Sequence, residues 1–316
     1  MASTGGMLSY ADFKRTARKL QIWWRKNVLN VGYQTYENVL CKSDAQLGLV
    51  FYEGFRKDIL KYLAQPIPKT SSVPSGQMLT NMLRSEHIPY NIFFPMQYDK
   101  EGCRMVFNDL IGQKEIKSIN DIKIEYHPEP IADFLNDHTA FDVFIAYTGY
   151  DDKPCGIGIE VKYTENSYPL KKGSREYTHL KDENGNTKLS KEYQQATDNS
   201  GWFKSGVEDD LISNKYRQIW RNHILGAAMI AHKDIDRFYS VTLFPELNVH
   251  FLTNAMPGYK NELLSDKGYQ TCIPLTYERL FSLIEKYFTM PQKNDWLKYL
   301  KDRYLFIALD CWENKF

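Results

Sequence analysis

Two short apolar segments separated by a turn constrain the fold of this chain more than any other feature. Residues 141–147 (FDVFIAY) and 156–163 (GIGIEVKY) are rich in β-branched and aromatic residues, which favour strands. The residues between them, TGYDDKP at 148–154, include the Gly, Asp and Pro of turns. The two segments therefore predict an antiparallel hairpin, and charged residues interrupt both of its apolar strands.

The charged residues of the hairpin predict a metal site. If the hairpin turns around residue 151, the middle of the predicted turn, Asp142 lies opposite Glu160, and Glu160 and Lys162 share a face because side chains alternate along a strand. Two close carboxylates repel each other, and a divalent cation resolves that conflict; oxygen ligands favour Mg²⁺ or Mn²⁺. Lys162 would then orient or help to deprotonate a metal-bound water, or stabilise charge on a phosphate. An exposed hairpin face is the alternative explanation.

The remaining pattern predicts a helix, three strands, a helix and a strand, flanked by further helices. The expected helices are 43–64, 75–85, 211–231 and 277–304, and the expected additional strands are 122–126 and 237–244. This order predicts an α/β or α+β domain with a central mixed sheet. Gly226 and the alanines after it would let the third helix pack close to that sheet.

The expected domain organisation is an N-terminal basic helical extension over residues 1–40 and one domain over residues 41–316. No acidic residue occurs from Phe13 to Tyr36, where six basic residues and two tryptophans do. Such a helix either tracks phosphates or is a solvated helix with two core tryptophans. The larger domain carries a polar insertion at 164–210, which we expect to be functional or mobile, and ends in helices.

Composition argues against several classes of protein, among them membrane-spanning and disulfide-rich proteins. The net charge of +1 gives no global signal for nucleic acid, and no apolar stretch approaches the roughly 20 residues of a membrane span. The N-terminus does not have the pattern of a signal peptide. Five scattered cysteines without a Cys-x-x-Cys pair predict neither a disulfide framework nor a zinc site, and they favour a reducing cytoplasm.

Residues 140–145 (AFDVFI) and 158–165 (GIEVKYTE) resemble the PD-(D/E)XK nuclease superfamily, and more narrowly a bacterial restriction-endonuclease-like group of unknown specificity. The resemblance extends to residues 85–93 and 216–223 and implies an αβββαβ core with extra flanking helices. It implies that Asp142, Glu160 and the Val161 carbonyl are metal ligands and that Lys162 is the catalytic lysine. Phe141 stands where the motif has proline, a variation that the family tolerates.

Supporting residues follow from the same resemblance. Many members add a glutamate from the first core helix, for which Glu53 is the candidate; Glu125 and Glu165 are further candidates. An exposed position on the helix explains Glu53 equally well.

One face of the predicted helix 211–231 carries polar residues at positions i, i+3 and i+4, namely Gln218, Arg221 and Asn222. A Gln or Arg on this face would hold Lys162 or a phosphate, so Gln218 is a candidate catalytic residue and Arg221 a candidate substrate-binding residue. The polar insertion would close on the substrate through its basic residues Lys171, Lys172, Arg175 and Lys191.

The sequence thus leads to the hypothesis of a Mg²⁺-dependent DNA endonuclease of the restriction type. A structure-specific or single-strand nuclease of repair, and a nucleic-acid-binding module that does not cut, are the alternatives. Cleavage of both strands of a duplex would favour a homodimer.

Overall fold

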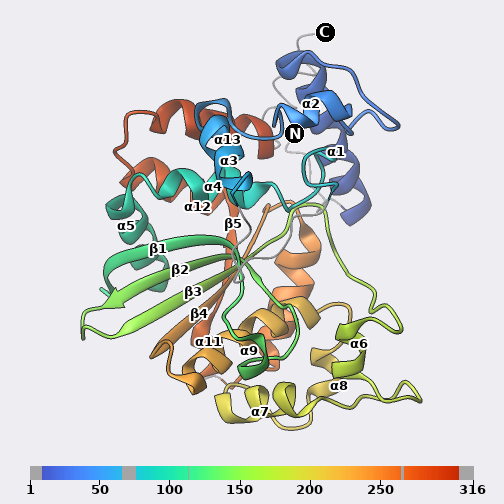
Figure 1. The fold of residues 1–316 in the computed structure, drawn as a ribbon, viewed down its shortest axis with the longest axis vertical. Coiled ribbons are helices and arrows are strands. Elements are labelled where there is room, and N and C mark those ends of the chain that lie inside the picture. Colours follow the sequence, from blue (N-terminus) through green and yellow to red (C-terminus); the bar gives the residue numbers. More distant parts are fainter. Residues whose placement is uncertain (1–8, 66–75, 113, 265–266, 306–316) are drawn as a thin grey trace, which may run out of the picture.

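A five-stranded mixed sheet forms the centre of the computed structural model, which describes residues 9–65, 76–112, 114–264 and 267–305 (Figure 1). In spatial order the strands are β1 (Ile116–Tyr126), β2 (Phe141–Gly149), β3 (Pro154–Val161), β4 (Arg237–Phe244) and β5 (Cys272–Thr276). The first three strands are antiparallel, and β4 and β5 run parallel to β3. The predicted α/β class with a central mixed sheet is confirmed.

Helices cover both faces of the sheet. Figure 1 shows α4, α5, α12 and α13 on one side and α9 and α11 on the other. On the first side and beyond it lie α1 (Tyr10–Trp24), η1 (Arg25–Leu29), α2 (Lys42–Gln46), α3 (Glu53–Leu63), α4 (Ile88–Met96), α5 (Lys100–Ile111), α12 (Tyr277–Tyr287) and α13 (Lys293–Tyr304). The other helices are η2 (Ile131–Asp133), α6 (Arg175–Leu180), α7 (Lys191–Ser200), α8 (Glu208–Leu211), α9 (Arg217–His232), η3 (His250–Ala255), α10 (Met256–Asn261) and α11 (Gly268–Thr271). Because both faces are covered, β2 and β3 are apolar almost throughout.

The α9 side of β3 is built for close packing. Gly156 and Gly158 have no side chain, so aromatic rings lie directly on the strand; a Cβ at Gly158 would come within 2.5 Å of the Phe141 ring. On α9 a Cβ at Gly226 would lie 2.1 Å from the ring of Phe238 on β4. The expectation that Gly226 allows the helix to approach the sheet is confirmed, and this approach brings α9 side chains to the end of β3.

The N-terminal helix α1 belongs to the main apolar cluster. Phe13, Leu20 and Trp24 are buried in it, and Trp23 packs against it. The buried amide of Gln21 donates to the Tyr163 hydroxyl and to the Arg303 carbonyl oxygen. The basic residues occupy the opposite, exposed face of α1.

Two predicted helices differ from the structure. The helix predicted over 43–64 is interrupted between α2 and α3, where Gly48 has φ +69° and Leu60 packs so closely that a Cβ at Gly48 would lie 2.9 Å from it. Residues 76–85 form turns instead of a helix, and Ser75 lies outside the described residues. The helix begins later, at Ile88, because a proline such as Pro89 fits the first turn, where its missing amide hydrogen is not needed.

The C-terminal half differs in smaller ways. The polar insertion contains three short helices, α6 to α8, and the expected helix 277–304 is two helices. Strand β5 was not predicted. Cys41, Cys103, Cys155 and Cys272 are free thiols, whereas Cys311 and residues 1–8 lie outside the described part. Among the described residues, no helix has the length and apolar character needed to cross a membrane.

Candidate active site

Three carboxylates lie side by side across the first three strands. The register pairs Ile124 with Val143 and Tyr126 with Phe141 between β1 and β2, and Val143 with Ile159 and Phe144 with Gly158 between β2 and β3. Continuing this register places Glu125 beside Asp142 and Asp142 beside Glu160. The hairpin register predicted from the sequence is confirmed, and Glu125 extends the pair to a row of three.

The row carries more negative charge than its surroundings neutralise. Burial raises the pKa of Asp142 well above its usual range, and the neighbouring Glu160 and Glu125 raise it further, whereas Lys162 and the Val161 amide act in the opposite direction. The pKa of Glu125 rises to about 8 because of burial and the charges of Glu86 and Glu160. Like charges have therefore been gathered where water solvates them poorly.

The backbone at Val161 faces this row. The Val161 amide donates to Asp142 Oδ2 at 2.6 Å. The next amide, that of Lys162, donates at 2.8 Å to the Leu243 carbonyl oxygen on the opposite side, in β4. Since the C=O and N–H of one trans peptide point in opposite directions, the Val161 carbonyl points away from β4 and towards Asp142. It is oriented as the third oxygen ligand of the resemblance requires.

Lys162 lies at the end of β3 and is buried, with 3% of its surface exposed. Its ammonium pairs with the Glu160 carboxylate, donates to the Gln218 side-chain oxygen and lies 4.7 Å from the centre of the Tyr168 ring. Burial lowers the pKa of this ammonium, but Glu160, Tyr168 and Asp142 raise it by more, so that it lies above its usual value. In this arrangement Lys162 is a hydrogen-bond donor to Glu160 and Gln218.

Helix α9 supplies two amides to the site from adjacent turns. Gln218 accepts from Lys162, and Asn222 donates to the second carboxylate oxygen of Glu160. Asn222 is 4% exposed, and its side-chain oxygen is buried without a hydrogen-bond partner. A buried acceptor of this kind lacks the donor that a bound water or an ordered ligand would supply.

The donor set fits a hard divalent cation. Asp142, Glu160 and the Val161 carbonyl offer oxygens only, which Mg²⁺ and Mn²⁺ prefer, and a cation would offset the repulsion within the row. The unpartnered Asn222 oxygen fits a water on such an ion. Among the described residues no group of three or more His, Cys, Asp or Glu side chains has the arrangement of a ready-made metal site. The set therefore depends on two carboxylates and a backbone oxygen.

Arg221 does not join Gln218 and Asn222. Its guanidinium pairs with Asp137 at 2.8 Å and with Glu176 at 2.9 Å, and it donates to the Tyr193 hydroxyl at 2.8 Å. Arg217, one turn before it, also pairs with Glu176. These contacts tie α6 and α7 to α9, and they occupy the donors with which Arg221 was predicted to bind substrate.

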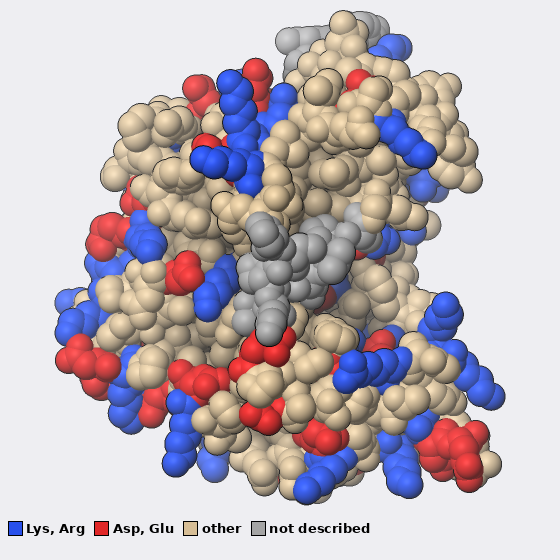
Figure 2. Space-filling model, in the orientation of Figure 1, with Lys and Arg blue, Asp and Glu red and all other residues tan. Residues whose placement is uncertain are grey.

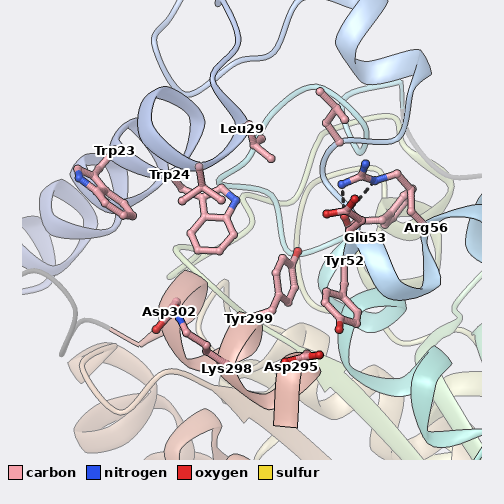
Figure 3. Close-up of a pocket in the computed structure, with 13 residues that line it drawn as sticks. Trp23, Trp24, Leu29, Tyr52, Glu53, Arg56, Asp295, Lys298, Tyr299 and Asp302 are labelled. Atoms are coloured by element: carbon pink, nitrogen blue, oxygen red, sulfur yellow. Dashed lines mark hydrogen bonds and ion pairs between the residues drawn. The ribbon is translucent and has the colours of Figure 1, made fainter. Parts of the chain in front are cut away.

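Glu53 is not brought to the carboxylate row. It lies in the exposed first turn of α3, at a separate cavity of about 420 Å³ that Figure 3 shows between Trp24, Tyr52 and Tyr299. The acidic neighbour of the row that the sequence reasoning missed is Glu86, just before α4, whose charge acts on Glu125. Glu86 belongs to the segment 85–93 that carried part of the resemblance, which was the available signal for it.

The predicted substrate-binding residues of the insertion lie at its surface. Lys171 and Lys172 are exposed, and Arg175 donates to the Asn136 carbonyl oxygen at 2.9 Å and contacts His138. Basic and acidic side chains are interspersed over the face in Figure 2, so that face has no continuous basic patch. From the insertion, Tyr168 reaches Lys162, and no sequence pattern singled it out.

The comparisons agree with this geometry. A family model described as the PD-(D/E)XK nuclease superfamily matches residues 9–306, from the start of α1 to the residue after the last described one. No curated protein and no solved structure matches the chain.

Proposed function

The chain belongs to the PD-(D/E)XK nuclease superfamily, and from that premise we propose that it is a Mg²⁺- or Mn²⁺-dependent endonuclease that hydrolyses phosphodiester bonds of DNA. The observation that carries this proposal is the juxtaposition of Asp142 and Glu160 with a buried, charged Lys162. The finer reading, a restriction-type enzyme, is part of the proposal and rests on the sequence resemblance.

The proposed division of labour follows from the contacts. Asp142, Glu160 and the Val161 carbonyl would hold the cation, which would supply a polarised phosphoryl oxygen and a bound water of lowered pKa. Lys162, whose ammonium donates to Glu160 and Gln218, would donate hydrogen bonds to the negative charge that develops on the phosphate. Gln218 orients that ammonium, and Asn222 orients Glu160 and presents an acceptor oxygen to water.

The test combines cleavage with metal binding. In purified Asp142→Asn and Lys162→Met variants, we expect Mg²⁺-dependent cleavage of plasmid DNA to fall by at least about a hundredfold. Calorimetry should show that Asp142→Asn loses Mn²⁺ binding while Lys162→Met keeps it, because Asp142 is a proposed ligand and Lys162 is not. The matched control is Asp152→Asn, in the exposed turn of the same hairpin, which should cleave as the unaltered protein does. Cleavage by Asp142→Asn at the unaltered rate would refute the proposed site.

A further inference from the structure

A second cavity lies next to the catalytic lysine and has the opposite character to the row of carboxylates. It has a volume of about 490 Å³ and lies between α1, the turns at 36–39 and 81–84, and the start of the insertion. Its charged lining residues are three cations, Lys14, Arg18 and Arg84, and one carboxylate, Glu165. We call it the α1 groove.

The α1 groove adjoins the active site through Tyr168. The Tyr168 ring lines the groove and also lies over the Lys162 ammonium, 4.7 Å from ring centre to Nζ. Tyr168 therefore contacts both the groove and the proposed catalytic lysine. A nucleic-acid strand with its scissile phosphate at Lys162 would have its neighbouring nucleotides in the groove.

Two of the three cations of the groove are available for phosphates, whereas Arg84 pairs with Glu86 at 2.7 Å. Lys14 and Arg18 are exposed, lie one turn apart on the same face of α1, and within the described chain neither is paired with a carboxylate. The carboxylate of Glu165, by contrast, accepts hydrogen bonds from the Ser85 and Tyr163 amides, so it serves the fold of the loop. The two unpaired cations outnumber this one carboxylate, so the net charge of the groove is positive and suits a phosphate backbone.

Aromatic rings accompany these cations. Tyr36 is 64% exposed and lines the groove with Tyr10 and Tyr168. Proteins bind single strands with cations that follow the backbone and with aromatic rings on which unpaired bases stack. The bases of a duplex are already stacked on each other, so they do not offer their faces to these rings.

We propose that the α1 groove binds an unpaired DNA segment next to the scissile phosphate, so that the proposed endonuclease prefers duplex DNA with a single-stranded tail or flap to blunt duplex. This preference favours the structure-specific alternative over the restriction-type reading. The inference rests on the proposed function for the scissile phosphate, but the binding of the tail does not require cleavage. In this proposal Lys14 and Arg18, from the basic run at the N-terminus, help to select the substrate.

The experiment measures binding and cleavage separately. Fluorescent blunt duplexes are compared with the same duplexes carrying a single-stranded DNA tail, first in Ca²⁺ for affinity and then in Mg²⁺ for cleavage. We expect the unaltered protein to bind and cut tailed DNA at least tenfold better. Lys14→Glu/Arg18→Glu should abolish that preference and lower the salt dependence of binding by a slope of about 1.4, for two lost phosphate contacts on a single strand.

The matched control is Arg15→Glu/Lys19→Glu, which makes the same change of charge on the same helix at exposed residues outside the groove. Tyr36→Ala, which leaves all charges in place, should weaken tail binding about fivefold through lost stacking. Lys14→Ala/Arg18→Ala repeats the test without charge reversal, and thermal unfolding verifies that each variant is folded.

The outcomes are distinguishable. Equal loss in the groove variant and the control, equal use of blunt and tailed DNA, or a preference for an RNA tail would each overturn the groove proposal even if DNA is cut. Groove-dependent binding of tails without any metal-dependent cleavage would support the groove and refute the proposed nuclease activity. Absence of both binding and cleavage would refute both.

Discussion

The backbone of Glu125 adopts a left-handed conformation that a non-glycine residue seldom takes inside a strand. Its φ is +56°, in a strand that also has two register irregularities before it. Such a conformation costs about 1–3 kcal/mol and persists where the surrounding structure imposes it. Here it accompanies a carboxylate placed beside Asp142 at a further electrostatic cost. Two unfavourable features at one residue support the view that this edge of the site is shaped for a ligand.

The buried side chain of His223 makes the stability of the fold depend on pH. His223 is fully buried between the Tyr259 hydroxyl and Thr271, and burial together with Lys260 lowers its pKa to about 3. The unfolded chain takes up this proton near pH 6.5, whereas the folded chain does not. The contribution of His223 to the free energy of unfolding is therefore complete above pH 6.5 and falls by about 1.4 kcal/mol per pH unit below it.

The difference between two proteins isolates this effect from the carboxylates, whose raised pKa values act in the opposite direction. Urea unfolding of the unaltered protein and of His223→Asn is measured at pH 7.5, 6 and 5. Between pH 6 and 5 the unaltered protein should lose about 1 kcal/mol more than the variant does. Parallel pH profiles would show that His223 titrates normally in the fold.

Residues on regular elements were the ones that could be placed from the sequence. Alternation along β3 put Glu160 and Lys162 on one face, and the helical period put Gln218 and Asn222 together. Arg221 satisfied the same period but lies on the side of α9 that faces α7 and Asp137, a packing partner that the period does not reveal. Tyr168 lies in an irregular loop, where no helical or strand periodicity predicts the direction of a side chain.

At the scale of elements, β3 depends on glycine for its contact with the aromatic layer. In Gly158→Ala the new methyl would lie 2.5 Å from the Phe141 ring and 2.7 Å from the Phe238 ring, both buried. We expect the free energy of unfolding to fall by about 1–3 kcal/mol, and the proposed nuclease activity to fall with it because Phe141 precedes Asp142. Chemical denaturation measures the first effect. Gly76→Ala, where the methyl meets open space, should change stability by no more than about 0.5 kcal/mol.

Strands were easier to predict than helices in this chain, for a physical reason. β2, β3 and β4 are apolar on both faces, so their composition alone marks them. The helix 43–64 was overextended because its apolar period continues through Gly48, where tertiary contact with Leu60 breaks it. β5 is five residues long and contains Pro274, which argues against a strand unless parallel pairing with β4 is known.

At the scale of the whole molecule, the candidate active site lies between two apolar clusters that meet at the sheet. The larger cluster runs from α1 through β1, β2 and β3 to α13, and the smaller one joins α7 and α9 to the other face. Gln21 of α1 reaches the Tyr163 hydroxyl, one residue after Lys162. The first helix is therefore connected to the site from behind, while its exposed face lines the α1 groove.

This connection makes the N-terminal segment a test of domain organisation. Its sequence predicts an extension over residues 1–40. In the structure Phe13, Leu20 and Trp24 are buried, and the burial of each side chain stabilises the fold by about 2 kcal/mol. Their sum is comparable to the marginal stability of a whole domain. A chain of residues 41–316 should therefore unfold at far lower urea concentration than the full chain. Leu20→Ala should lower the free energy of unfolding by about 2–5 kcal/mol. Lys19→Ala, on the exposed face of the same helix, is the control and should change it little. A 41–316 chain of undiminished stability would establish the segment as a separable extension, with the larger cluster complete without it.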